Sequence, residues 1–223
     1  MNSNKQSPGD ILILTADGTI ERIVKTIVFR RYRSLGLSSA PSEKSVQIVS
    51  HPGRDPGVYS RIDLLRQISS PAKRHIIILD EEWEGSPGSS QIIQSLAQKL
   101  NNIGFNAAPN KVIVATPSID GWVWGPIQCF LEEIQWLSRP GVNRNNAYSD
   151  LLSHLEDAGY ELQNTPCKKP KKPKAALEYI LSKIQRPRAR EFYVRIAECA
   201  GIRNCCDPSF NDLIRTLHSW LNY

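Results

Sequence analysis

Residues 76–82 are Ile76-Ile77-Ile78-Leu79-Asp80-Glu81-Glu82, so four consecutive apolar residues run directly into three acids. A short apolar run of this kind is typical of a parallel strand that is buried on both faces of its sheet. Three similar runs lie in the first half of the chain, at 11–14, 46–49 and 112–115. Together these runs predict four buried strands.

The segments between these runs carry helical patterns. The apolar residues between Ile20 and Val28 fall on one helical stripe, with charged residues opposite, and comparable spacing occurs at 59–68 and 92–100. Strands that alternate with helices are typical of a parallel sheet with helices on both faces. The sequence therefore predicts an α/β fold with a mostly parallel, Rossmann-like sheet.

The second half of the chain shows helical patterns only, and we expect helices at 126–137, 147–158, 174–184, 188–200 and 207–221. Asp207-Pro208 is a favourable helix start, because Asp caps the free backbone N–H groups and Pro suits the first helical position. We therefore expect an α/β core at residues 1–137 and a helical C-terminal extension at 138–223, packed on that core.

Composition sets broad limits on function. The 223 residues are 40% hydrophobic and 22% charged, as in ordinary globular proteins. No apolar run approaches the roughly 20 residues of a membrane-spanning helix, so we expect no membrane partner. A net charge of +6 and a pI near 9.1 permit nucleic acid as a partner without requiring it.

The cysteines and the chain start favour a reducing, cytoplasmic location. The five cysteines form an odd set: Cys129, Cys167, Cys199, Cys205 and Cys206. The stretch from Met1 to Asp10 is polar and unlike a signal peptide. We therefore expect free thiols. The spacing of the cysteines matches no standard zinc pattern.

Acids follow three of the four predicted strands, at the edge where ligands of parallel sheets bind. Asp17 comes after the first strand with Glu21 one helical turn on, Asp80 and Glu82 follow the third, and Asp120 follows the fourth. Carboxylate oxygens suit a hard cation such as Mg²⁺. These acids also have a structural interpretation, in which Asp17 caps the next helix and the acids after the third strand form a solvated turn.

A run of lysines lies in the second half of the chain. The segment 167–174 contains two prolines and five lysines, namely Lys168, Lys169, Lys171, Lys172 and Lys174. We expect an exposed basic loop there. It either only solvates the surface or contacts a nucleic-acid backbone, which would make binding salt-dependent and indifferent to base sequence.

Two tryptophans and one histidine follow predicted strands. Trp122 and Trp124 follow the fourth strand, where they either stack on bases or fill the gap between sheet and helix, and we favour packing. His51 follows the second strand, within reach of the acidic edge. A single histidine in a turn is more often structural, and we favour that interpretation.

Four short motifs follow one another along most of the chain. They are Asp17-Gly18-Thr19-Ile20-Glu21, Asp80-Glu81-Glu82, Asp120-Gly121-Trp122 and Pro208-Ser209-Phe210. In this order they resemble the Toprim domain, the metal-binding module of topoisomerases, primases and overcoming-lysogenization-defect-type nucleases. The layout is most similar to the compact single-domain Toprim-like proteins of bacterial defence and restriction neighbourhoods.

The resemblance implies Mg²⁺- or Mn²⁺-dependent cleavage of nucleic-acid phosphodiesters, in antiviral defence. It implies that Asp17, as acid/base, and Glu21 are catalytic, and that Asp80, Glu82 and Asp120 bind the metal. Asp17 stands where the family has Glu, and Glu82 stands where it has Asp. Both changes keep the charge but alter the reach, and a misplacement of about 1 Å can cost roughly a hundredfold in rate.

Two other functions remain open. The first is a non-catalytic Toprim-like scaffold that binds nucleic acid or partner proteins in a defence complex, which the short Asp17 and the basic loop would suit. The second is a flavodoxin-like, nucleotide-sensing domain, which a nucleotide would stabilise without metal.

Overall fold

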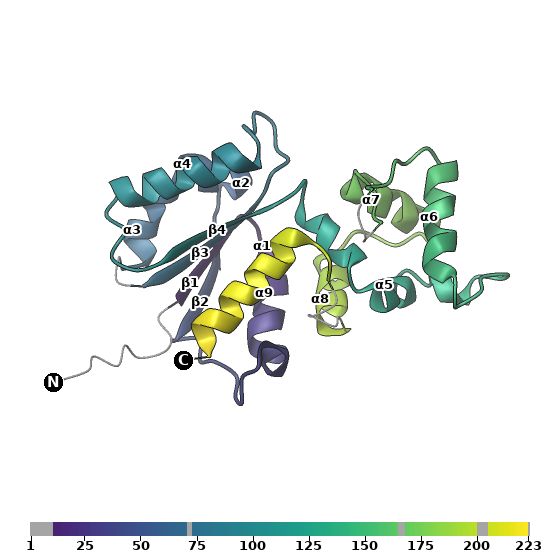
Figure 1. Ribbon diagram of the computed structural model, residues 1–223, viewed down its shortest axis with the longest axis horizontal. Coiled ribbons are helices and arrows are strands. Elements are labelled where there is room, and N and C mark those ends of the chain that lie inside the picture. Colours follow the sequence, from purple (N-terminus) through teal and green to yellow (C-terminus); the bar gives the residue numbers. More distant parts are fainter. Residues whose placement is uncertain (1–10, 71–72, 165–167, 200–204, 223) are drawn as a thin grey trace.

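The computed structural model describes residues 11–70, 73–164, 168–199 and 205–222. Its sheet has the order β2-β1-β3-β4, and each neighbouring pair is parallel. The strands are β1 (Ile11–Thr15), β2 (Val46–Ser50), β3 (Arg74–Asp80) and β4 (Asn110–Ala115). The four predicted strands are confirmed, and with helices flanking the sheet the fold is α/β (Figure 1).

Helices cover both faces of this sheet. Figure 1 shows α2, α3 and α4 on one face and α1 and α9 on the other. Their bounds are α1 (Gly18–Lys25), α2 (Arg54–Ser60), α3 (Leu65–Ile68), α4 (Ser89–Asn102) and α9 (Pro208–Leu221). The continuous helix predicted at 59–68 is wrong in detail, because a 3₁₀ turn at Ile62–Leu64 separates α2 from α3. The stripe from Ile20 to Val28 is shared between α1 and a π-helical turn, Thr26–Arg30.

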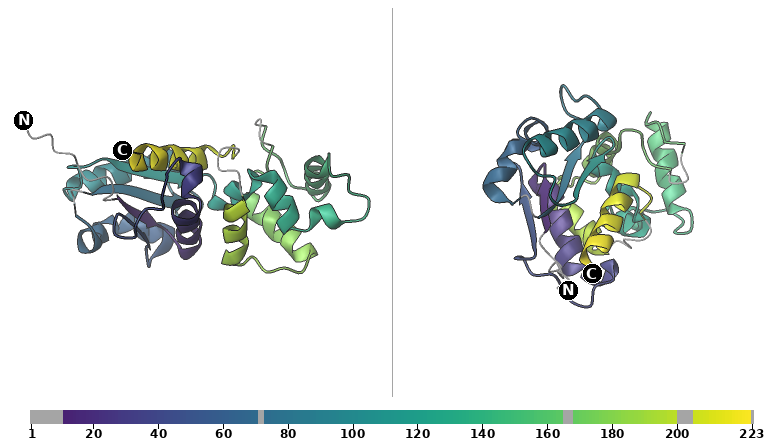
Figure 2. Two further views of the ribbon diagram at one scale, coloured as in Figure 1. Left: turned by 90° about the horizontal axis from the view of Figure 1, so that it is seen from below. Right: turned by 60° about the vertical axis from the view of Figure 1, so that its left-hand side comes forward.

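The remaining helices form a second lobe beside the carboxyl end of the sheet (Figures 1 and 2). They are α5 (Ile127–Glu133), α6 (Ala147–Asp157), α7 (Pro173–Lys183) and α8 (Arg190–Cys199). Between β4 and this lobe lies a 3₁₀ helix, η4 (Ile119–Trp124), which carries the two tryptophans that follow the fourth strand. The predicted helical character of the second half is confirmed in the part of the chain that the structure describes.

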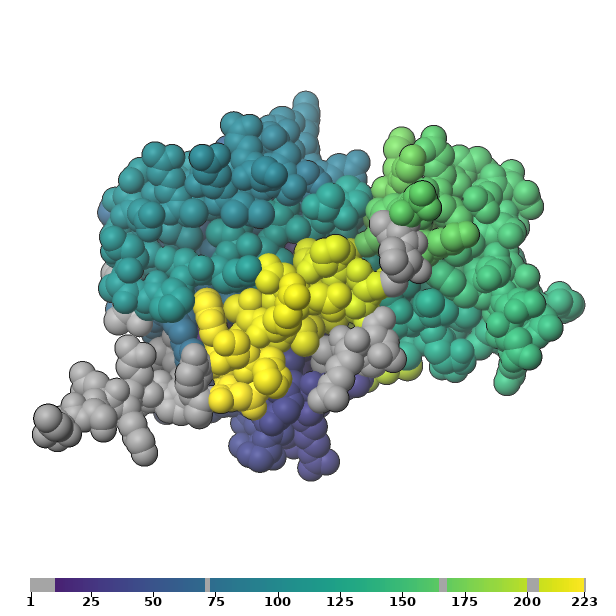
Figure 3. Space-filling model, in the orientation of Figure 1, coloured from purple at the N-terminus to yellow at the C-terminus, as the bar shows by residue number. Residues whose placement is uncertain are grey.

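The last helix, α9, leaves the helical lobe and returns to the sheet, which Figure 3 shows as a strip lying across the core. Asp207 caps it as predicted, since its Oδ1 accepts N–H bonds from Ser209 and Phe210. Lys111 Nζ on β4 lies 2.6 Å from Asp212 Oδ2 on α9. Helix α9 therefore packs with the core although it follows the lobe in sequence.

Side chains from η4 join the two lobes in one hydrophobic core. Trp122 and Trp124 are both buried, which confirms that they pack rather than stack on a ligand. The Trp122 Nε1–H donates to Ser209 Oγ at 2.8 Å, and its ring meets Phe210 edge-on. The packing of η4 thus holds α9 to the residues that follow β4.

The cysteines differ from the expectation of free thiols. Cys129 on α5 and Cys199 on α8 form a disulfide with a Cα–Cα distance of 5.9 Å. The expectation was wrong for this pair because sequence spacing does not show that the two helices lie side by side, and it was wrong for Cys206, which is also disulfide-bonded. Cys205 is a free, buried thiol, while Cys167 lies outside the described residues. None of the described helices is both long and apolar enough to span a membrane.

Candidate functional site

The register of the sheet places Asp17 and Asp80 at matching positions. In the parallel β1–β3 pair, Thr15 lies opposite Ile78. Asp17 and Asp80 each come two residues after that pair, at the carboxyl edge of adjacent strands. The two acids that sequence analysis selected therefore lie at one edge, which the sequence alone could not establish.

Asp80 is held by backbone hydrogen bonds at this edge. Its Oδ1 accepts the N–H of Ile119 at 2.8 Å, and its own N–H donates to Asp55 Oδ1 at 2.7 Å. Burial raises the pKa of Asp80 well above its ordinary value, and the charges of Asp55, Asp120 and Asp17 raise it further. The hydrogen bond from Ile119 opposes this shift only in part. Acidic groups are therefore concentrated at this edge, and the fold disfavours the charged form of Asp80.

Asp55 is an acid of this cluster that the sequence analysis missed. It lies in the first turn of α2, after β2, and burial raises its pKa, as does the nearby charge of Asp17. The rule that found the other acids, a search after each strand, would have found Asp55 if applied to the second strand. The same segment carries His51, which is buried and accepts the N–H of Gly53 through Nδ1, as its structural interpretation predicts.

Asp17 also does what its structural interpretation predicts. Its Oδ1 accepts the N–H groups of Thr19 at 2.7 Å and Ile20 at 2.9 Å, so it caps α1. All the hydrogen bonds accepted by the side chains of Asp17 and Asp80 go to Oδ1. Within the described residues, the Oδ2 atoms of both acids accept no hydrogen bond. Those two oxygens remain available to a ligand.

Asp120 belongs to a buried polar network that joins η4 to the helical lobe. Both of its carboxylate oxygens accept from the Arg188 guanidinium, at distances between 2.8 and 3.1 Å, and Tyr193 also donates to it. The Ser118 hydroxyl also donates to Asp120 Oδ2, at 3.2 Å. Burial and the Asp120 charge raise the pKa of the Tyr193 hydroxyl, which keeps it a donor. Asp120 therefore has its charge balanced within the protein.

The other two predicted acids lie away from this network. Glu21 Oε1 pairs with Lys25 Nζ at 2.6 Å, one turn further along α1. Glu82 is exposed, and its backbone N–H donates to Pro117 O at 2.9 Å. Neither carboxylate makes a contact with Asp17 or Asp80 in the described residues.

The arrangement sets limits on how a metal could be held. No group of three or more Asp, Glu, His or Cys side chains in the described residues is placed to hold an ion. Mg²⁺ in proteins often takes only one or two carboxylates, together with waters and substrate phosphates. Asp17 and Asp80 fit that smaller donor set, because each presents an oxygen without a hydrogen-bond donor at the same edge.

The lysine segment differs from the predicted exposed loop. Lys169 is buried and forms an ion pair with Asp207, so its side chain is not available to a ligand. Lys171 pairs with Glu161 at 2.7 Å, and backbone bonds join this segment to residues 161–163. The exposed lysines are Lys168, Lys171, Lys172 and Lys174, so only Lys169 departs from the predicted exposure. Tertiary pairing, which a charge run does not show, accounts for the difference.

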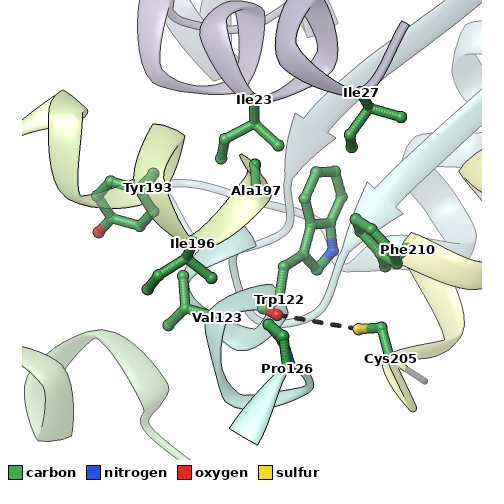
Figure 4. Close-up of a pocket in the computed structure, with 10 residues that line it drawn as sticks. All are labelled: Ile23, Ile27, Trp122, Val123, Pro126, Tyr193, Ile196, Ala197, Cys205 and Phe210. Atoms are coloured by element: carbon green, nitrogen blue, oxygen red, sulfur yellow. Dashed lines mark hydrogen bonds between the residues drawn. The ribbon is translucent and has the colours of Figure 1, made fainter. Parts of the chain in front are cut away.

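Two hollows lie elsewhere in the described part of the chain. Figure 4 shows an apolar cavity of about 30 Å³ where α1, η4, α8 and the start of α9 meet, with Cys205 Sγ directed toward Trp122 O. Burial raises the pKa of Cys205 to about 11, which makes it an unreactive thiol. A larger hollow of about 560 Å³ on the lobe contains Arg186 and Arg195, but both pair with Glu133.

Comparison of this chain with protein-family models, with curated proteins and with solved structures finds no match. The Toprim resemblance therefore rests on the four motifs and their order.

Proposed function

We propose that this protein is a Toprim-like nuclease that cleaves nucleic-acid phosphodiesters with a divalent cation at the acidic edge of its sheet. The observation that carries the proposal is the matched placement of Asp17 and Asp80, each with a free Oδ2, beside further acids. A cation would relieve the repulsion that raises the pKa of Asp80. The motifs predict an acidic site at this edge, and the register of β1 and β3, which brings Asp17 and Asp80 there, supports the proposal.

In this proposal Asp80 and Asp17 hold Mg²⁺ or Mn²⁺, which would stabilise charge on the phosphate oxygens. Asp17 acts as a ligand rather than as the acid/base, because the N–H groups of α1 hold its Oδ1 in place while its Oδ2 accepts no hydrogen bond in the described residues. Asp55 fixes the backbone of Asp80, and Asp120 supports the edge through Arg188. Glu21 and Glu82 remain candidates for supporting roles.

Nucleic acid is the proposed substrate, because cations are exposed on the helical lobe beside this edge. Lys168, Lys172 and Lys174 are exposed and make no ion pair within the described residues. They suit contacts to phosphates, which are weakened by salt and do not select base sequence. Lys169 is excluded from this set by its buried pair with Asp207, whereas Lys171 is exposed and could exchange its surface pair with Glu161 for a phosphate.

A cleavage assay tests the proposal. Purified protein is incubated with plasmid, linear DNA and RNA, each with Mg²⁺, Mn²⁺ or EDTA. We expect cleavage that EDTA abolishes and that Asp80→Asn lowers by about a hundredfold or more, a loss typical of removing a group that stabilises the transition state. Asp63→Asn is the matched control, since Asp63 is an exposed acid that pairs with Arg61.

The outcomes are distinct. Cleavage that persists unchanged in Asp80→Asn would show that another site, or a contaminant, is responsible. Equal losses in the Asp63 and Asp80 variants would point to a general effect of charge. The cleavage rate of Asp55→Asn is expected to lie between the rates of the Asp63 and Asp80 variants, because Asp55 acts through the backbone of Asp80.

A second candidate function is a non-catalytic scaffold that binds nucleic acid or protein partners in a defence complex. The observation that favours it is the structural use of two predicted site acids, Asp17 as a helix cap and Asp120 in its pair with Arg188. It predicts no cleavage and no effect of Mg²⁺ on melting temperature. A Mg²⁺-dependent rise in melting temperature that Asp80→Asn removes would argue against it.

A further inference from the structure

Three polar side chains form a hydrogen-bonded relay at the amino edge of the sheet, opposite the acids. Ser69 Oγ lies 2.8 Å from His75 Nε2, and His75 Nδ1 lies 3.0 Å from Asn110 Oδ1. A hydroxyl, an imidazole and an orienting acceptor in this order are the arrangement that activates a serine nucleophile. No other part of the proposed function uses these residues.

The hydrogen bond of Asn110 to the backbone fixes the direction of the relay. Asn110 Nδ2 donates to the carbonyl of Phe105, so the Oδ1 atom must be the one that faces the imidazole. His75 therefore carries its proton on Nδ1 and donates it to Asn110. The Nε2 atom is left with a lone pair, and it accepts the hydroxyl proton of Ser69. This is the direction of proton transfer that a general base requires.

Burial keeps the imidazole neutral. His75 is fully buried, and this burial lowers its pKa, while the charge of Lys73 lowers it further. The ring packs on Phe105 with centroids 4.9 Å apart. Ser69 is only half-buried, so its hydroxyl lies at the boundary between the relay and solvent. A base shielded from water thus faces a nucleophile that a reagent can approach.

The fold holds the relay rigidly. His75 and Asn110 are opposite each other in the β3–β4 register, and the His75 N–H donates to Pro109 O. Ser69 directly follows α3, and its N–H donates to Leu65 O at 2.9 Å. Two of the three residues therefore lie on paired strands, which is where a functional constellation is best kept in position.

We propose that Ser69 is an activated nucleophile that accepts acyl groups from small carboxylic esters, with His75 as general base and Asn110 as a positioning residue. Ser69 Oγ bonds to the ester carbonyl carbon while its proton passes to His75 Nε2. The ester C–O bond breaks, and the alcohol leaves with that proton. Water then hydrolyses the acyl serine in the same manner and restores the hydroxyl.

An active-site-directed fluorophosphonate reports on this site, because the Ser69 Oγ–P bond forms as the P–F bond breaks and fluoride leaves. We expect one equivalent of label, located on Ser69 by peptide mass spectrometry, and release of p-nitrophenol from p-nitrophenyl acetate. Ser69→Ala is expected to abolish both signals. Ser70→Ala, the adjacent serine, is the matched control and should retain them. No label on the wild type, or equal label on both variants, would overturn the proposal.

The base and the positioning residue are tested separately. His75→Gln should slow labelling by about a hundredfold, a typical contribution of general base catalysis, with its fold checked by circular dichroism. Asn110→Ala should also slow labelling and change its pH profile, because the Nδ1 proton of His75 loses its acceptor. A changed pH profile with an unchanged circular dichroism spectrum separates positioning from loss of structure, and labelling at the wild-type rate would remove Asn110 from the relay. These measurements need no metal and no nucleic acid, so their result is independent of the nuclease assay.

Discussion

At the scale of the residue, the fold disfavours the charged form of the Asp80 carboxyl group. Burial and three neighbouring acids all favour its protonated form. Because its native pKa lies above that of the unfolded chain, Asp80 contributes most favourably to folding below the unfolded pKa of about 3.9. That contribution is lost as the pH rises from there through the raised native pKa.

Removing this charge should therefore stabilise the protein at neutral and alkaline pH. We expect Asp80→Asn to melt above the wild type at pH 8, by about 2–4 °C for each 1 kcal/mol of relieved repulsion. The amide keeps an oxygen that accepts the Ile119 N–H. The difference should shrink as the pH falls through the raised native pKa toward the unfolded value, because the wild-type carboxyl gains its proton in that range. Calorimetry across this pH range measures the effect, and a variant that melts below the wild type at pH 8 would contradict it.

Sequence reasoning succeeded at single residues when a local rule was sufficient. Asp207 was identified as a helix cap, and capping was one of the two interpretations given for Asp17, because a cap depends on the next three residues only. Lys169 was assigned wrongly because its ion pair with Asp207 spans distant parts of the chain. Asp120 was expected to bind metal, but no local pattern shows that Arg188 and Tyr193 balance its charge.

At the scale of the element, the ion pair of Lys169 ties a short segment of the lobe to the beginning of α9. The two side chains are 7% and 3% exposed, and Asp207 uses its other oxygen to cap α9. Loss of the lysine would leave a buried carboxylate without its counter-ion. The pair therefore affects both the segment and the helix start.

Lys169→Met should accordingly destabilise the protein by about 3–5 kcal/mol, the usual cost of breaking a buried pair from one side. Lys168→Met, at the exposed neighbour, should change the free energy of unfolding by less than about 0.5 kcal/mol. Urea denaturation of both variants makes the comparison. If both changes proved equally mild, the segment would be a solvated loop as its sequence suggested.

The strands were the elements best predicted from the sequence, since a parallel strand buried on both faces appears as a continuous apolar run. The 3₁₀ helix η4 was missed because its conformation follows from packing of Trp122 and Trp124 between the lobes. The break between α2 and α3 was missed for a related reason. Apolar spacing at 59–68 fits one helix, whereas the buried Ile62 lies in the 3₁₀ turn and the buried Leu65 begins α3.

At the scale of the whole molecule, the disulfide between Cys129 and Cys199 closes a loop that contains most of the helical lobe. It joins α5 to α8, and α8 carries Tyr193, which bonds to Asp120. The disulfide therefore constrains the part of the lobe that contacts the carboxyl edge of the sheet.

Removal of both cysteines should lower stability by about 2–4 kcal/mol, mainly through the greater freedom of the unfolded chain. We expect Cys129→Ala/Cys199→Ala to unfold at lower urea concentration than the wild type without reductant. Cys205→Ala is the reference for a buried thiol outside the link. Identical unfolding of the double variant and the wild type would show that the lobe does not depend on this bond.

The position of α9 has a consequence for biosynthesis. Strand β4 emerges from the ribosome long before the helix that packs against it, because the whole helical lobe is translated in between. The part of the sheet around β4 that α9 covers must therefore stay exposed beside α1 until residues 208–221 are made. During that interval the nascent chain is expected to be a substrate for chaperones, and slow codons within the lobe would prolong its exposure to aggregation.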